Sequence, residues 1–186
     1  MTAAFDNTML SILLNPDGGI PHDPATNAPV IEAKARAEAV VQQLQKARRK
    51  IILPAPACAE LLTAIGPEAQ QYLNIVGRSR VFEVGNFDAR CAAELALLNR
   101  GEFQQQDNQN HAEPYQKRKV DRQIIAITKV YGASEIYTDD SGLAKRALIC
   151  GITPISIAEV ALPEAAKQIP LALEPHDPIP EGVDIE

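Results

Sequence analysis

The stretch Glu135–Ile155, EIYTDDSGLAKRALICGITPI, places a strand, a helix and a second strand within one short segment. Ile136–Thr138 and Ile152–Ile155 have the apolar character of short buried strands. Between them, Gly142–Cys150 favours a helix, and Gly151 is well placed to end it. A helix that connects neighbouring strands of one sheet makes those strands parallel, so this stretch indicates an α/β domain.

The rest of the chain continues this order of strands and helices. Further strands are expected at residues 3–6, 51–53 and 81–84, and helices at residues 8–14, 31–50, 56–65, 67–76, 88–98 and 119–131. Turn-rich or polar segments at residues 16–29 and 101–113 are expected to be loops. The order predicts an α/β domain at residues 1–158, with a mainly parallel sheet of about five strands. An acidic, proline-rich tail at residues 159–186 is expected to be extended or disordered.

Composition limits the kinds of partner. The chain has 186 residues and 46% hydrophobic content, which is enough for one well-buried domain. Aromatic residues make up only 4% and tryptophan is absent, so a base-stacking surface for single strands is not expected. The net charge of −6 comes from the tail, because the first 158 residues hold seventeen acidic and seventeen basic side chains. A neutral body with clustered lysines and arginines can still bind phosphate locally.

The cysteines and the hydropathy pattern favour a cytoplasmic protein. Cys58, Cys91 and Cys150 have no metal-binding spacing and lie in or beside apolar stretches, so we expect reduced, buried thiols. No cationic and then apolar leader opens the chain. No apolar run approaches the roughly 20 residues that a membrane span needs. We therefore expect a cytoplasmic location without membrane contact.

Common signatures of other enzymes are missing. The chain has no GxSxG, GxxxxGK[ST] or GxGxxG motif, which leaves serine hydrolases, phosphate-loop hydrolases and dinucleotide-binding enzymes without their main support. His22, His111 and His176 lie in polar segments and form no zinc-ligand spacing. The candidate chemistry therefore depends on carboxylates.

Five acidic residues stand where predicted strands end or on the helices that follow. They are Asp6, Glu60, Asp121, Asp139 and Asp140. Because the carboxyl ends of parallel strands meet at one edge of a sheet, we expect these side chains to converge. Converging carboxylates are typical of a divalent metal site. Taken singly, each acid is also suited to capping a helix or to a solvated helix surface.

Four segments resemble, in the same order, the four acidic motifs of PIN-domain ribonucleases. They are Phe5–Thr8, Ala57–Leu62, Asp121–Ile127 and Thr138–Asp140, and the similarity extends from about Thr2 to Ile157. Membership of this family implies a three-layer α/β/α sandwich and a ribonuclease that hydrolyses RNA with metal-activated water and Mg²⁺ or Mn²⁺. Many small members, the VapC-like group among them, are toxins of toxin–antitoxin pairs. The expected partners are then RNA, an antitoxin protein and a second copy of the chain.

The resemblance also implies roles for the acids. Asp6, Glu60, Asp121 and Asp140 are expected to be catalytic metal ligands. The fourth acid is a choice between neighbours, because Asp139 stands beside Asp140, and the motif spacing favours Asp140.

Polar and basic neighbours of these acids are expected to hold the carboxylates or the substrate. Asn7, Thr8 and Thr138 match the polar residues of the motifs. The basic residues at 117–119 and Arg122 are suited to RNA phosphates, with Lys119 and Arg122 preferred, or equally to a solvated start of a helix.

Two other functional classes stay open from the sequence. Phe5–Met9 and the later Asp139 and Asp140 are also similar to phosphatases with an aspartyl nucleophile, which act on small phosphomonoesters. Those enzymes carry a second aspartate where this chain has Thr8. The other class is a non-catalytic binding module with a PIN-like fold.

Overall fold

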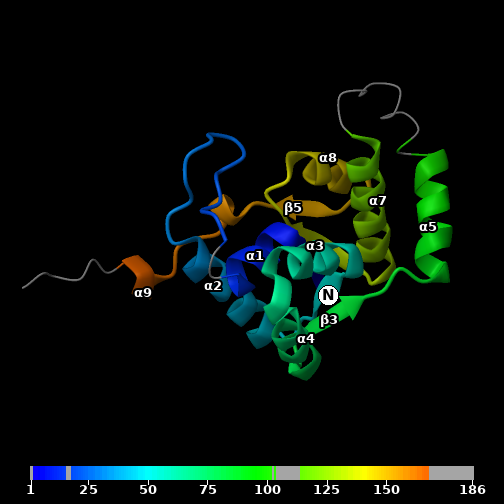
Figure 1. Ribbon diagram of the computed structural model, residues 1–186. Coiled ribbons are helices and arrows are strands. Elements are labelled where there is room, and N and C mark those ends of the chain that lie inside the picture. The colour runs from blue at the N-terminus through cyan, green and yellow to red at the C-terminus, as the bar shows by residue number, and fades with distance from the viewer. Residues whose placement is uncertain (1, 16–17, 102, 104–113, 168–186) are drawn as a thin grey trace, which may run out of the picture.

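Within residues 2–15, 18–101, 103 and 114–167, which the computed structural model describes, five strands pair in one sheet (Figure 1). The strands are β1 (Thr2–Phe5), β2 (Ile51–Pro54), β3 (Phe82–Gly85), β4 (Ala133–Tyr137) and β5 (Thr153–Ile155). Their order is β3-β2-β1-β4-β5, and every pairing between them is parallel. The predicted α/β class and parallel sheet are therefore confirmed.

Helices cover both faces of this sheet. They are α1 (Asn7–Leu14), α2 (Ala33–Lys46), α3 (Ala55–Ile65), α4 (Ala69–Arg78), α5 (Ala89–Arg100), α7 (Tyr115–Val130), α8 (Ser141–Ile149) and α9 (Glu164–Lys167), with short 3₁₀ turns η1 (Gly66–Glu68) and η2 (Ile157–Glu159). Right-handed crossovers place α1 to α4 on one face and α5, α7 and α8 on the other. The result is the three-layer α/β/α sandwich.

The chain order reverses between β1 and β4. From β1 the chain moves outward to β2 and β3, whereas β4 pairs on the other side of β1 and leads to β5. β1 is consequently the central strand, and its residues Ala3, Ala4 and Phe5 are fully buried. In an open parallel sheet, the crevice at such a reversal is where ligands bind, beyond the carboxyl ends of the strands.

Several predicted elements differ from the structure in their extent. The helix predicted at residues 119–131 begins earlier, at Tyr115, directly after Pro114, whose fixed φ angle suits a helix start. The helix predicted at residues 31–50 is shorter, because Glu32 and Arg48 both take left-handed backbone angles, each with φ of 54°, outside the two ends of α2. The segment after residue 160 was expected to be extended or disordered, yet it contains the short helix α9.

The segments expected to lack regular structure lie partly outside the described residues. The turn-rich segment at 16–29 is a loop in its described part, with one antiparallel bridge between His22 and Pro29. Most of the polar segment at 101–113 lies outside the described residues, as does the tail beyond residue 167. The helical turn η2 crosses the expected boundary at residue 158, and Ile157 is buried in the core.

None of the three cysteines forms a disulfide, and Cys91 is fully buried. Burial raises the pKa of Cys58 to about 11, so its thiol stays protonated at neutral pH. No helix of the described residues is long and apolar enough to cross a membrane.

Close packing between the sheet and α7 depends on Gly85 at the end of β3. A Cβ atom at this position would lie 2.6 Å from Ile127 Cγ2 and 2.8 Å from Ile52 Cγ2. Both isoleucines are buried and β-branched, so neither side chain can turn away easily. Gly85 thus allows α7 to approach the sheet closely.

The variant Gly85→Ala is expected to lower the free energy of unfolding by about 1–3 kcal/mol, because the added methyl group overpacks this contact. The matched control is Gly77→Ala in α4, where a Cβ atom meets nothing within 4 Å and a helical alanine is favoured. Guanidinium unfolding measures both variants. A Gly85→Ala protein as stable as the wild type would contradict the close packing.

Candidate functional site

Asp6 stands between β1 and α1, at the reversal point of the sheet. It caps α1, because its Oδ1 accepts a hydrogen bond from the Met9 backbone N–H at 3.2 Å. Its Oδ2 accepts one from the Thr8 hydroxyl at 3.4 Å and a short one from the Thr138 hydroxyl. Thr138 directly follows β4, so this hydrogen bond joins the carboxyl ends of the neighbouring strands β1 and β4.

The environment of Asp6 opposes its negative charge. Only 4% of the residue is exposed. Burial raises the pKa of Asp6 to about 7; hydrogen bonds from Thr138 and Met9 act against this rise, and the negative charge of Asp139 adds to it. Near neutral pH, Asp6 is consequently only partly ionised, and a nearby cation would favour its carboxylate form.

Asp140 follows β4 and caps α8. Its Oδ1 accepts hydrogen bonds from the backbone N–H groups of Gly142, at 2.7 Å, and Leu143, at 2.9 Å. Its Oδ2 lies 2.6 Å from the ammonium nitrogen of Lys117 in α7. Burial alone would raise the pKa of Asp140, but the hydrogen bonds from Lys117, Leu143 and Gly142 outweigh burial and lower it. Asp140 is therefore held as an anion by donors from two helices.

Asp121 lies in α7 and is buried, with 6% of its surface exposed. Its Oδ2 accepts a hydrogen bond from Arg146 Nη1 at 2.9 Å, and Arg146 is itself buried in α8. The sequence prediction did not include Arg146. Its signal was its place three residues after Leu143 and one before Ala147, on the inward stripe of a helix, where an arginine needs an acidic partner.

Glu60 comes from α3 and is exposed. Partial burial raises its pKa, the negative charge of Asp140 raises it further, and the positive charge of Lys117 lowers it. Glu60 therefore shares an electrostatic environment with Asp140 and Lys117, although the three come from three different helices.

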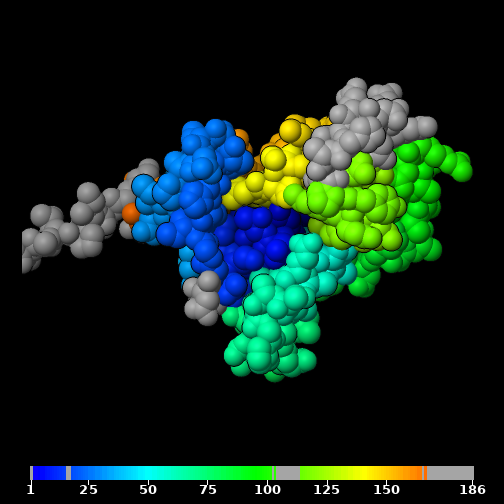
Figure 2. All heavy atoms as spheres, turned by 45° about the horizontal axis from the view of Figure 1, so that its top comes forward, coloured from blue at the N-terminus to red at the C-terminus, as the bar shows by residue number. Residues whose placement is uncertain are grey.

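These side chains line one cavity of about 400 Å³. The lining residues are Asp6, Asn7, Thr8, Glu60, Gln116, Lys117, Val120, Asp121, Ile124, Asp140 and Leu143. Figure 2 shows the hollow, with N-terminal residues in dark blue at its floor and segments of α3, α7 and α8 around it. The structure thus brings together the four acids that the sequence analysis preferred.

Asp139 lies outside this lining. Its Oδ1 accepts hydrogen bonds from the Ser156 hydroxyl at 2.7 Å and from the Ile157 backbone N–H at 3.0 Å, at the start of η2. Its Oδ2 is buried and has no hydrogen-bond donor among the described residues. Nearby, Arg36 of α2 donates to the carbonyl oxygens of Ala158, within η2, and of Val160, directly after it. Asp139 therefore anchors η2, and its charge still acts on Asp6.

The predicted substrate-binding residues are more dispersed. Asn7 and Thr8 line the cavity, and Asn7 Oδ1 accepts a hydrogen bond from the Ser11 hydroxyl at 3.3 Å. Lys119 is exposed and lies outside the lining. Arg122 is also outside; it donates to Asn99 Oδ1 at 3.1 Å and lies over the ring of Phe103 at 5.0 Å. Arg122 is thus engaged with the region of α5.

A larger hollow of about 520 Å³ lies between α1, α2 and α4, away from these acids. Its described lining is mostly apolar and contains no aspartate or glutamate. Size therefore does not identify the functional site, whereas the group of buried acids does.

The acids around the smaller cavity have the donor chemistry of a site for a hard divalent cation. Carboxylate oxygens are the ligands that Mg²⁺ and Mn²⁺ prefer, and the buried carboxylate of Asp6 would gain from a nearby cation. As placed, however, no three His, Cys, Asp or Glu side chains of the described residues are grouped tightly enough to hold one ion. Lys117 and Arg146 occupy oxygens of Asp140 and Asp121, so metal binding requires side-chain movement.

Comparisons with known proteins support the fold. The chain is similar to a chain of the crystal structure of VapBC2 from Rickettsia felis bound to a DNA fragment from their promoter, with a TM-score of 0.53 and 17% sequence identity. The similarity covers 84% of this chain and 98% of the other. No protein-family model and no curated protein matches the sequence. At this level of identity the likeness establishes a shared architecture, in agreement with the PIN-like sandwich expected from the sequence.

The raised pKa of Asp6 gives a stability prediction for the metal-free protein. Between its ordinary value of 3.8 and about 7, the folded state binds more protons than the unfolded state, so the free energy of unfolding falls as pH rises. Between pH 5 and 7.5 the loss due to Asp6 is about 2–3 kcal/mol. Asp6→Asn, which is neutral and of equal size, should remove this loss. Guanidinium unfolding in chelator at both pH values measures it, and an equal loss in the variant would contradict the assignment.

The buried pair of Asp121 and Arg146 predicts a coupling energy. Arg146→Met leaves Asp121 buried without this partner and should cost about 3–5 kcal/mol of stability. The double variant with Asp121→Asn should lose less than the sum of the two single variants, by about 1–3 kcal/mol. Lys145→Met, at an exposed position of the same helix, is the control and should stay within about 0.5 kcal/mol of the wild type. Additive losses in chemical denaturation would show that the pair is not coupled.

Proposed function

We propose that this chain is a metal-dependent ribonuclease that hydrolyses phosphodiester bonds of RNA and uses Mg²⁺ or Mn²⁺. The observation that carries the proposal is the cavity at the reversal point of the sheet, lined by Asp6, Glu60, Asp121 and Asp140. Four acids from distant parts of the chain line one cavity, although such charges repel each other. The four motifs that resemble PIN-domain ribonucleases supply these same four residues.

Each acid has a distinct task in this proposal. Asp6, fixed by Thr138 and by its cap of α1, is the central ligand, because its buried carboxylate gains most from a cation. Asp121 is a ligand carried by α7, and Asp140 is one carried by the start of α8. Held by these carboxylates, Mg²⁺ or Mn²⁺ would supply a nucleophilic water at neutral pH and would stabilise negative charge on the phosphate.

Glu60 lines the cavity from α3. The pKa of Glu60 is raised above that of an ordinary glutamate. We assign Glu60 as the second acid of the site, in direct or water-mediated contact with the metal. Asp140 is preferred to Asp139 as the fourth acid, because Asp140 lines the cavity and Asp139 anchors η2.

Substrate RNA is expected to lie across the cavity, along the basic start of α7. Lys119 is exposed there and free in space to meet a phosphate, whereas Arg122 must first leave Asn99. Asn7 and Thr8 are placed to orient the substrate or the carboxylates from the cavity floor. Binding through these groups should weaken as salt concentration rises.

The biological setting proposed is that of a cytoplasmic toxin with an antitoxin partner, as a homodimer. The similarity to a chain of a VapBC2 structure supports this setting, since the sequence motifs resemble PIN-domain ribonucleases, a family in which many small members are toxins. The aspartyl phosphatase is less well supported, because Thr8 donates a hydrogen bond to Asp6 from the position where those enzymes carry an acid.

An RNA cleavage assay tests the proposal. The purified chain is incubated with mixed single-stranded RNA and Mn²⁺, with and without chelator. Wild-type protein should cleave only without chelator, and Asp6→Asn and Asp121→Asn should each lose at least about 100-fold in rate, because each removes a ligand charge. Lys46→Met, an exposed change in α2, is the matched control and should cleave at the wild-type rate.

Three outcomes would contradict the proposed ribonuclease. Cleavage that persists in chelator, or in both aspartate variants, would exclude a metal mechanism at these residues. Phosphate release from a small phosphomonoester with RNA intact would favour the phosphatase. RNA binding without cleavage under any metal would favour the non-catalytic module. Thermal unfolding of each variant confirms that a loss of rate is not a loss of fold.

A further inference from the structure

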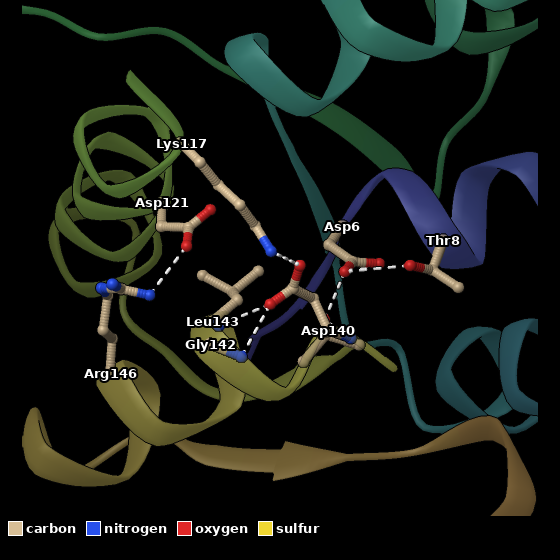
Figure 3. A network of polar contacts seen from close by, with 9 residues as sticks. Asp6, Thr8, Lys117, Asp121, Asp140, Gly142, Leu143 and Arg146 are labelled. Carbon is tan, nitrogen blue, oxygen red and sulfur yellow. Dashed lines mark hydrogen bonds and ion pairs between the residues drawn. The ribbon is translucent and has the colours of Figure 1, made fainter. Parts of the chain in front are cut away.

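Lys117 is the one basic side chain in the described lining of the cavity, and the sequence analysis did not single it out from its neighbours. It lies in α7 one helical turn before Asp121, so the two side chains share a helix face. Figure 3 shows the Lys117 side chain reaching from α7 across to Asp140, past Asp121. The ammonium nitrogen lies 2.6 Å from Asp140 Oδ2.

The charge of Lys117 also acts on a second acid of the cavity. The positive charge of Lys117 lowers the pKa of Glu60, against the effects of burial and of Asp140. One ammonium group therefore partly neutralises two carboxylates that come from α3 and from the start of α8. A divalent ion bound to these acids would perform the same electrostatic task.

The ion pair of Lys117 with Asp140 is more exposed than the ion pair of Arg146 with Asp121. The Arg146 side chain is 7% exposed and Asp121 is 8% exposed, so separating them leaves a buried charge. The Lys117 side chain is 45% exposed, so its flexible stem can carry the ammonium from Asp140 into water. Of these two ion pairs, the one between Lys117 and Asp140 is the one that can open reversibly.

We propose that Lys117 is an internal counter-cation of the metal site: its ammonium occupies Asp140 in the metal-free protein and must be displaced when a divalent ion binds. Lys117 thereby sets the metal concentration at which the site fills. This inference rests on the proposed function, because it takes Asp6, Asp140 and their neighbours as metal ligands. It adds a residue that competes with the metal, rather than one that binds it.

Competition follows from the geometry of Asp140. Its Oδ1 already accepts two backbone hydrogen bonds that cap α8, so Oδ2 is the oxygen better placed to coordinate an ion. That same oxygen holds the ammonium of Lys117. Removing the ammonium should therefore free a ligand and raise the net negative charge of the cavity, and both effects favour a divalent cation.

The test measures Mn²⁺ binding to the full chain by isothermal titration calorimetry, without RNA. Lys117→Met, which keeps the length and loses the charge, should bind Mn²⁺ about fivefold more tightly than wild type, the scale expected for a partly exposed ion pair. Lys117→Arg keeps the charge and should stay within about twofold of wild type. Lys46→Met loses the same charge at an exposed position in α2 and should leave the affinity within the same range. Asp6→Asn identifies the titrated site by abolishing binding.

Each other outcome overturns the inference. Equal or weaker Mn²⁺ binding by Lys117→Met, with binding still lost in Asp6→Asn, rejects the role of Lys117 and leaves the metal site standing. Tighter binding in both Lys117→Met and Lys46→Met shows an effect of net charge alone. The absence of Asp6-dependent Mn²⁺ binding in every variant rejects the metal site and the inference together. Thermal unfolding in chelator checks that each variant is folded.

Discussion

The hydrogen bond from Thr138 to Asp6 connects the two central strands where the chain order of the sheet reverses. This hydrogen bond lies beside a group of acidic side chains, and hydrogen-bond donors around Asp6 partly offset the cost of burying its charge. A carboxylate with 4% exposure is costly in water-poor surroundings, and Asp6 responds with a pKa near 7. The cap of α1 and the position of α8 both depend on this junction, since Thr138 also accepts a hydrogen bond from the Asp140 backbone N–H.

The four acids of the cavity are stabilised in four different ways. Asp6 has hydroxyl and backbone donors, Asp121 has a buried arginine, Asp140 has a lysine and a helix start, and Glu60 has solvent. This difference matters because acids that were all paired with buried cations would bind an added cation only weakly. The structure instead leaves the buried acid Asp6 without a cationic partner among the described residues and places the exposed Lys117 in the cavity lining.

Much of the fold could be predicted from the sequence, because the evidence for it is local. Short apolar runs that alternate with helices indicate parallel strands, and the acids at the strand ends then fall at one edge of the sheet. Lys117 and Arg146 could not be assigned in the same way. Their partners lie in another helix, 23 and 25 positions away in the sequence, and only the packing of α7 against α8 brings them together. The earlier start of α7 at Tyr115 is also decisive, since it makes Lys117 part of the helix that carries Asp121.

The hydrogen bonds of Asp139 connect η2 to the backbone beside the cavity. Asp139 is adjacent to Asp140 in the backbone, and its carboxylate holds Ser156 and Ile157 on one side while Arg36 holds the carbonyl of Val160 on the other. Of these two neighbouring aspartates, Asp140 lines the cavity and Asp139 binds the residues that directly follow β5. Displacement of η2 would therefore pull on the backbone directly beside Asp140, which lines the cavity of acids.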